Sequence, residues 1–179
     1  MMLRVKMTDI PLRLSRISVL VALLMAVSCS DFIVSRNVKR MMGREIAFPA
    51  KFDGVIGSGR PKMVFHYRPS DCSTCRIRSL DGYNELFEKF ENEVEFVILF
   101  STTDIGYDRV RSEIENSSLK CKVYLDKGNE FDCINNFLPD DSRFHAFLLD
   151  NGNRIVFVGD PMSKESLLRL FEKKISGMR

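Results

Sequence analysis

The chain has 179 residues, of which 45% are apolar, so it can form one globular domain with a substantial core. Its formal charge of +3 is accounted for by residues 1–28, where four basic residues outnumber one acidic residue. The rest of the chain is neutral and its charges are mixed in sign, which argues against nucleic acid as a partner.

The N-terminal segment has the features of an export signal. An apolar run from Ile17 to Val27 follows the basic residues; at about 11 residues it is too short to span a bilayer as a helix. The run leads into Cys29, an ending similar to that of bacterial lipoprotein signals, although those usually have Leu where Ala26 stands. An ordinary cleaved signal, an uncleaved anchor or a buried cytosolic helix are the alternatives.

A lipoprotein signal divides the chain into three parts. We expect a signal peptide over residues 1–28, a tether over 29–42 that can include a short helix, and one domain over 43–179. The resemblance implies cleavage before Cys29, whose acyl chains then anchor the mature protein to a membrane of the bacterial cell envelope, on the periplasmic side. In that exported compartment disulfides can persist.

The domain is expected to alternate strands and helices. Apolar runs predict a short strand over 45–48 and then strands over 63–67, 95–100, 122–125, 144–149 and 154–158. Helical spacing predicts helices over 72–92, 107–115, 130–137 and 164–175, with Asp104 and Ser163 as caps. A turn at residues 150–153 makes the last two strands a hairpin. This order predicts a mixed sheet with helices on both faces.

The most informative motif is Cys72-Ser73-Thr74-Cys75, at the junction between a buried strand and a helix. Unpaired N–H groups at the helix start favour a thiolate at Cys72, which becomes the attacking sulfur. Cys75 lies one helical turn further on and can resolve a mixed disulfide. We predict that Cys72 is the more exposed thiol and that Cys75 is protected behind it.

This arrangement resembles the thioredoxin-like superfamily, and most closely the extracytoplasmic TlpA/ResA-like thiol-disulfide proteins, over about residues 43–177. The resemblance implies a three-layer α/β sandwich with a central mixed sheet. It also implies protein thiols and disulfides, or a membrane redox partner, as reactants, with no cofactor and no metal. Those proteins usually carry Trp where Asp71 stands and a cis-proline where Phe144 stands. Asp71, Phe144 and His145 are therefore candidate substrate-facing residues.

His66 is a third candidate catalytic residue. It lies six residues before Cys72, where the resemblance implies a buried carboxylate that assists the resolving cysteine. An imidazole can take the same role, and the alternative is a strand histidine satisfied by backbone groups or facing solvent. His145 can face the same site or lie on the surface of an edge strand.

Other chemistries fit the sequence less well. Arg76 after the motif excludes haem attachment, a structural zinc site lacks ligands, and Pro69 replaces the threonine of a peroxiredoxin. Cys121 and Cys133 are either free thiols or a structural disulfide. The sequence thus predicts a cell-envelope thiol-disulfide oxidoreductase; the alternative is a thioredoxin-fold binding module with little redox activity.

Overall fold

The computed structural model describes residues 32–57 and 59–178. Residues 32–41 are helical, and the compact unit that carries the fold begins at Arg40. The expected signal peptide and Cys29 lie outside the described residues. Within the described part of the chain, no helix is both long enough and apolar enough to cross a bilayer.

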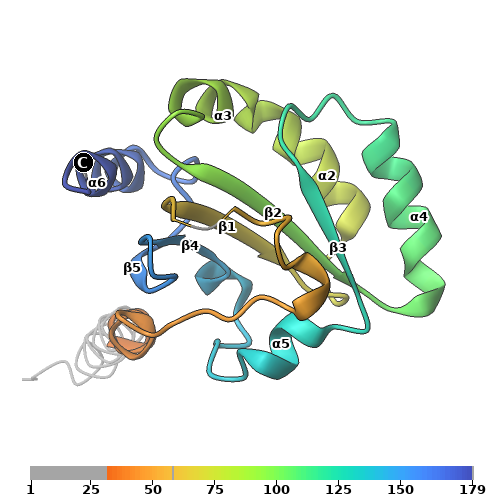
Figure 1. Cartoon of the computed structure of the whole chain (residues 1–179), viewed down its shortest axis with the longest axis horizontal. Helices are drawn as coiled ribbons and strands as arrows, with labels where there is room; N and C mark the ends of the chain where they lie inside the picture. Colours follow the sequence, from red (N-terminus) through yellow and green to blue (C-terminus); the bar gives the residue numbers. More distant parts are fainter. Residues whose placement is uncertain (1–31, 58, 179) are drawn as a thin grey trace, which may run out of the picture. The chain divides into compact units, whose positions relative to one another are not determined.

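A five-stranded mixed sheet forms the centre of the unit, in the order β3-β2-β1-β4-β5 (Figure 1). Strands β1, β2 and β3 are parallel, whereas β4 is antiparallel to β1 and β5 is antiparallel to β4. The strands are β1 (Lys62–Tyr67), β2 (Glu95–Thr102), β3 (Val123–Lys127), β4 (Ala146–Leu149) and β5 (Ile155–Val158). The last two form the expected hairpin.

Helices cover both faces of the sheet, which confirms the expected α/β sandwich (Figure 1). One face packs against α2, α3, α4 and α6 in a core that includes Phe65 and Phe100. The other face is covered by α5, whose Phe131 contacts Phe48. The helices are α2 (Ser73–Leu80), α3 (Asn84–Phe90), α4 (Asp104–Glu115), α5 (Glu130–Ile134) and α6 (Glu165–Ser176), with 3-10 turns η1 (Ala50–Phe52), η2 (Asp81–Tyr83) and η3 (Ser142–Phe144).

The long helix expected over residues 72–92 is interrupted. Helix α2 ends at Leu80, the 3-10 turn η2 follows, and α3 begins at Asn84. Gly82 lies in the middle of this turn. Glycine is among the weakest helix formers, so the α-helix gives way to a 3-10 turn here. The helical spacing of the apolar residues continues across this turn, which is why it predicted a single helix.

Both expected helix caps are wrong by one residue. Thr103 and Lys164 occupy the cap positions of α4 and α6. The Ser163 hydroxyl instead donates to the carbonyl of Asp160 at 2.7 Å, in the turn that precedes α6. Asp104 begins α4 instead and its carboxylate pairs with Lys127.

Two expected strands are shorter than their apolar runs. The expected strand over 45–48 is only an isolated bridge between Glu45 and Arg154. Strand β4 begins at Ala146, because Phe144 belongs to η3, whose first turn is capped when the Asp141 carboxylate accepts the Arg143 amide. This 3-10 turn directly precedes a central strand, and it shapes the site described next.

Candidate functional site

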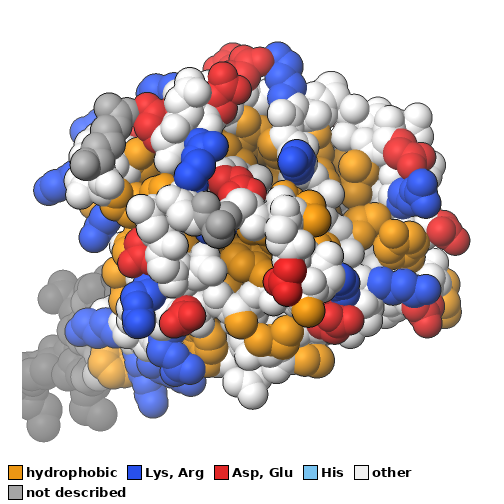
Figure 2. Space-filling view, in the orientation of Figure 1, with side chains coloured by type: hydrophobic (Ala, Val, Ile, Leu, Met, Phe, Trp, Pro, Cys, Tyr) orange, Lys and Arg blue, Asp and Glu red, His pale blue; other side chains and the backbone are white. Residues whose placement is uncertain are grey.

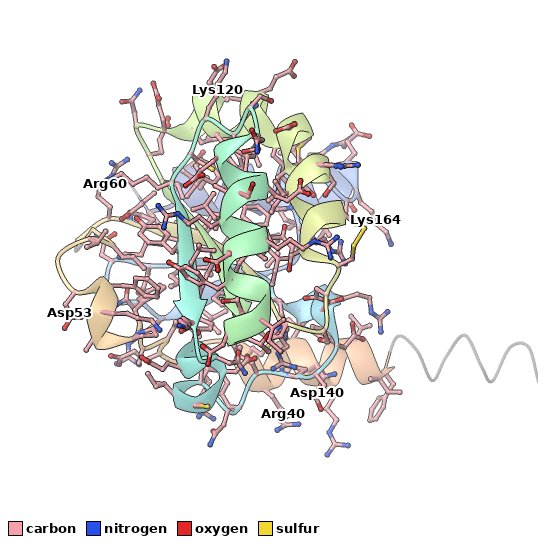
Figure 3. The ribbon with its side chains drawn as sticks, turned by 90° about the vertical axis from the view of Figure 1, so that its right-hand side faces the viewer. Arg40, Asp53, Arg60, Lys120, Asp140 and Lys164 are labelled. Atoms are coloured by element: carbon pink, nitrogen blue, oxygen red, sulfur yellow. A yellow bond between two sulfur atoms is a disulfide. The ribbon has the colours of Figure 1, made fainter. Side chains whose placement is uncertain are left out.

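A disulfide joins Cys72 to Cys75 at the start of α2, where Figure 3 draws it as a yellow bond. Cys72 precedes the first helical residue, and its carbonyl accepts the Arg76 amide at 3.0 Å. Free amides and the helix dipole stabilise negative charge here, so this position favours a thiolate at Cys72 in the reduced protein. Both cysteines are exposed. The protection of Cys75 in the reduced protein stays a prediction, because the structure holds the disulfide form.

The four residues before Cys72 form a turn that Asp71 closes. The Asp71 amide donates to the Arg68 carbonyl, and the Asp71 carboxylate accepts the Arg68 amide, each at 2.9 Å. Asp71 is only half-exposed. The Asp71 carboxylate is thus hydrogen-bonded within the turn. These bonds fix the backbone immediately before Cys72.

The Arg68 side chain ties this turn to the opposite wall of the site. Its Nε lies 2.9 Å from Oδ2 of Asp132 on α5, and its guanidinium also donates to Asp140 at 3.0 Å. Asp140, labelled in Figure 3, lies on the loop between α5 and β4. One residue therefore connects the dithiol turn to the segment that leads into the hairpin.

His66 is buried on β1, with 1% of its surface exposed, and it faces away from the core that contains Phe65 and Tyr67. Its Nε2 lies 3.0 Å from Ser101 Oγ, and the Ser101 hydroxyl donates to Asp126 Oδ2 at 3.1 Å. Because Ser101 gives its only proton to Asp126, His66 must donate through Nε2. Its tautomer is therefore fixed.

The other ring nitrogen of His66 is left without a donor. Nδ1 is buried and has no hydrogen-bond partner, and it lies 3.8 Å from Asp132 Oδ1. Burial lowers the pKa of His66 to about 2, with further lowering by His145 and Arg68. The ring is therefore neutral, and Nδ1 is its one basic atom. No hydrogen bond joins His66 to either cysteine among the described residues.

His145 is the second buried histidine of this site. Its ring stacks on His66 with 5.1 Å between centroids and 12° between planes. Its Nε2 lies 2.7 Å from the Pro139 carbonyl, which only accepts, so Nε2 carries the proton here too. Burial again lowers the pKa of the ring.

Two of the three expected substrate-facing residues are not at the surface. Phe144 and His145 are each 2% exposed. Phe144 is turned into the core by η3, and His145 is held between His66 and the 139 carbonyl. Both side chains are thus buried in this structure, and their expected role in facing a substrate stays a prediction.

Sequence reasoning missed the polar residues that hold His66. Ser101 and Asp126 are fully buried at the carboxyl ends of β2 and β3, and Lys51 pairs with Asp126 at 2.5 Å. A signal existed, because polar residues at the ends of adjacent parallel strands meet at one edge of a sheet. Asp132 carried no such signal, since it lies on a short helix whose orientation only the fold reveals.

The remaining cysteines stand apart from the dithiol. Cys121 and Cys133 are free, and burial raises the pKa of Cys121 to about 12. Of the two alternatives, the free thiols are thus the observed form, although Cys133 is exposed. Within the described chain, no cluster of three or more His, Cys, Asp or Glu side chains is arranged to hold a metal ion.

Solved structures share the fold of this chain, whereas no protein-family model and no curated protein matches its sequence. A DsbE-type thiol:disulfide interchange protein from Chlorobium tepidum is 15% identical, covers 66% of this chain and 82% of its own, and superposes with a TM-score of 0.50. The thioredoxin domain of a thiol-disulfide oxidoreductase from Bacteroides vulgatus is 17% identical, with coverage of 66% and 81% and a TM-score of 0.48. StoA from Bacillus subtilis is 13% identical, with coverage of 66% and 86% and a TM-score of 0.46. The fold of this chain is thioredoxin-like.

Proposed function

We propose that this thioredoxin-like chain is an exported, membrane-anchored thiol-disulfide oxidoreductase of the bacterial cell envelope. One observation carries the proposal: Cys72 and Cys75 are bridged at the first turn of the helix that follows the central strand. Its reactants are protein thiols and disulfides, or a membrane redox partner. The fold alone does not specify an activity, so the dithiol carries the argument.

The chemistry requires only the two sulfurs. In the reducing direction, the Cys72 thiolate attacks a partner disulfide, a mixed disulfide forms and one partner thiolate leaves. Cys75 then attacks the Cys72 sulfur, which closes the bridge between them and releases the second partner thiolate. Two electrons pass to the partner, together with the two protons of the dithiol. The oxidising direction is the reverse.

His66 is the proposed proton acceptor when Cys75 loses its proton. Support comes from its neutral ring, whose Nδ1 lone pair is free and lies beside the Asp132 carboxylate. Because burial holds its pKa near 2, the ring keeps a proton only transiently. The expected contribution is therefore at the lower end of general-base catalysis, which is about 10²-fold.

Equilibration of the domain with dithiothreitol buffers, read by the mass added on alkylation, tests the dithiol. We expect a reversible two-electron transition that traps Cys72 and Cys75 together. Cys72→Ser and Cys75→Ser should each abolish it. Cys133→Ser is the matched control, because Cys133 is also exposed but has no bridging partner.

The outcome separates the two functions that the chain could have. A bridge that neither opens nor re-forms across the buffers, in a folded domain, would exclude the oxidoreductase. The remaining function would be a binding module, the one favoured by the replacement of Trp and cis-proline with Asp71 and Phe144. A transition that survives in Cys72→Ser would assign the redox chemistry to other cysteines.

A further inference from the structure

The helix that carries the dithiol has a one-sided charge. Helix α2 contains two arginines, Arg76 and Arg78, and no acidic residue in its sequence STCRIRSL. Both arginines are exposed. Beyond residue 28 the chain as a whole is neutral, so this helix is a local exception.

Neither arginine is neutralised within the described part of the protein. Arg76 lies 5.9 Å from the centre of the Tyr67 ring, a cation–π contact that leaves its charge in place. Arg78 has no ion-pair or side-chain hydrogen-bond partner among the described residues. Some exposed arginines are paired, such as Arg111 with Glu115 on α4, whereas others, such as Arg109 on the same helix, also have no ion pair among the described residues. Figure 2 shows the usual interspersed charges over β3 and α4.

The spacing brings these charges to the sulfurs. Arg76 follows Cys72 by four residues and Arg78 follows Cys75 by three, and residues at these separations are neighbours on a helix surface. Asp71, the acidic residue beside Cys72, is held in its turn by the Arg68 amide, and Asp81 follows Arg78 at the end of α2 without forming an ion pair with it in the described structure. The exposed bridge is thus flanked by two unpaired guanidinium groups.

We propose that this face docks polypeptide partners whose reacting cysteine is flanked by acidic side chains. The proposal rests on the oxidoreductase function above and adds the substrate class to it. Complementary charge raises the rate of encounter and orients the partner. Guanidinium groups also bind carboxylates in a fixed planar geometry, so they can set the approach of a segment with Asp or Glu beside its cystine.

The reaction at this face is the thiol-disulfide exchange between Cys72, Cys75 and the partner's disulfide. The reduced dithiol gives two electrons and two protons to the partner's disulfide, whose S–S bond breaks as the Cys72–Cys75 bond forms. The arginines exchange no atoms in this step. They hold the partner's carboxylates while Cys72 attacks the adjacent sulfur, so they act as specificity residues.

Three disulfide-linked peptide dimers test the proposal, with two Glu, two Gln or two Lys residues beside the cysteine. The reduced domain, freed of reductant, is mixed with each peptide, and formation of the bridge is followed at low salt. Each rate is divided by that of dithiothreitol with the same peptide, which removes intrinsic differences in probe reactivity. We expect the order Glu, Gln, Lys, with about fivefold between neighbours, as attraction between unit charges about 4 Å apart in water predicts.

Variants assign this preference to the two arginines. Arg76→Gln and Arg78→Gln should each reduce the Glu/Gln rate ratio, and the double variant should remove it. Arg76→Lys and Arg78→Lys keep the charge and should keep most of the ratio. Arg111→Gln is the matched control, because it removes a paired arginine from the neighbouring helix. Raising the salt concentration should compress the ratio in the parent and in the variants that keep it, and should have no effect on it in the double Gln variant.

The possible results are distinct. If the parent neither reduces the peptide disulfides nor, in its disulfide form, oxidises the peptide thiols, the oxidoreductase function fails. If it reduces all three at equal normalised rates, or if the double variant keeps the preference, only the docking proposal is overturned. A fourth probe, glutathione disulfide, separates polypeptides from small anions. If its rate carries the entire arginine dependence while the Glu peptide carries none, the polypeptide assignment is wrong.

Discussion

Hydrogen bonds around His66 decide where its proton lies and what the ring can do. Ser101 and Asp126 hold the proton on Nε2, which leaves Nδ1 bare beside Asp132. A serine, a histidine and an aspartate also form the triads of hydrolases, but here the serine proton points to the carboxylate and the imidazole is the donor. No base is therefore available to take the serine proton, and Ser101 and Asp126 instead hold the tautomer of His66.

Removing His66 should affect one half-reaction more than the other. His66→Ala should slow resolution of a trapped mixed disulfide at Cys72 by about 10²-fold, while leaving its formation nearly unchanged. Rapid acid quenching followed by mass spectrometry measures the rates of formation and of resolution of the mixed disulfide. Ser101→Ala is a companion variant that frees the tautomer but keeps the ring. Equal resolution rates in a folded His66→Ala domain would make His66 a packing residue.

The two buried histidines should make folding sensitive to mild acid. Their pKa values are lowered in the folded state, so the unfolded chain binds protons first as the pH falls. Stability is thus complete above about pH 6.5 and declines below it. His66 alone should cost about 2 kcal/mol between pH 7.5 and pH 5. Urea unfolding at these two pH values measures the loss.

His66→Gln provides the reference for this acid effect. The substitution removes the imidazole with the strongly lowered pKa, but it retains an amide that can hydrogen bond to Ser101. Its stability should change less between pH 7.5 and pH 5 than that of the parent, whatever its absolute stability. A slope equal to the parent's would assign the acid sensitivity to other groups.

Helices and strands show which features can be predicted at the scale of elements. The five strands of the sheet followed from their apolar runs, because a strand covered on both faces needs apolar residues throughout. Element ends did not, because the Ser163 hydroxyl and the η3 turn depend on contacts that spacing does not encode. The partners of His66 were missed because β2, β3 and α5 supply them, the first of them Ser101, 35 residues further along the chain.

Backbone conformation at two glycines should give opposite responses to the same substitution. Gly82 has a negative φ and open space around its Cβ position, so Gly82→Ala should raise the stability by about 0.4–1 kcal/mol. Gly128 also has open space but a φ of +90°, so Gly128→Ala should lower it by about 1 kcal/mol. Thermal unfolding of both variants measures the signs. The same sign in both would contradict the backbone argument.

At the scale of the whole molecule, attachment to a membrane is the remaining proposal. Mass spectrometry of the full chain extracted from membranes should find a mature protein that begins at Cys29 and carries acyl chains on it. Cys29→Ala should leave the protein unacylated and uncleaved at this position. Cys133→Ala, which removes an exposed free cysteine of the fold, should change neither. A mature N-terminus elsewhere would exclude the lipoprotein.

The chain that follows residue 40 determines how a mechanical load would enter the fold. Gly43 and Arg44 exchange backbone hydrogen bonds with Ile155, and the Ile46 amide donates to Asn153. These bonds join the first part of the unit to β5, at the outer edge of the sheet. A force applied ahead of Arg40 is therefore borne first by these few edge bonds. These bonds would break before the hydrogen bonds between the inner strands. The dithiol, which follows the carboxyl end of the central strand β1, would therefore keep its position at forces that only open the edge.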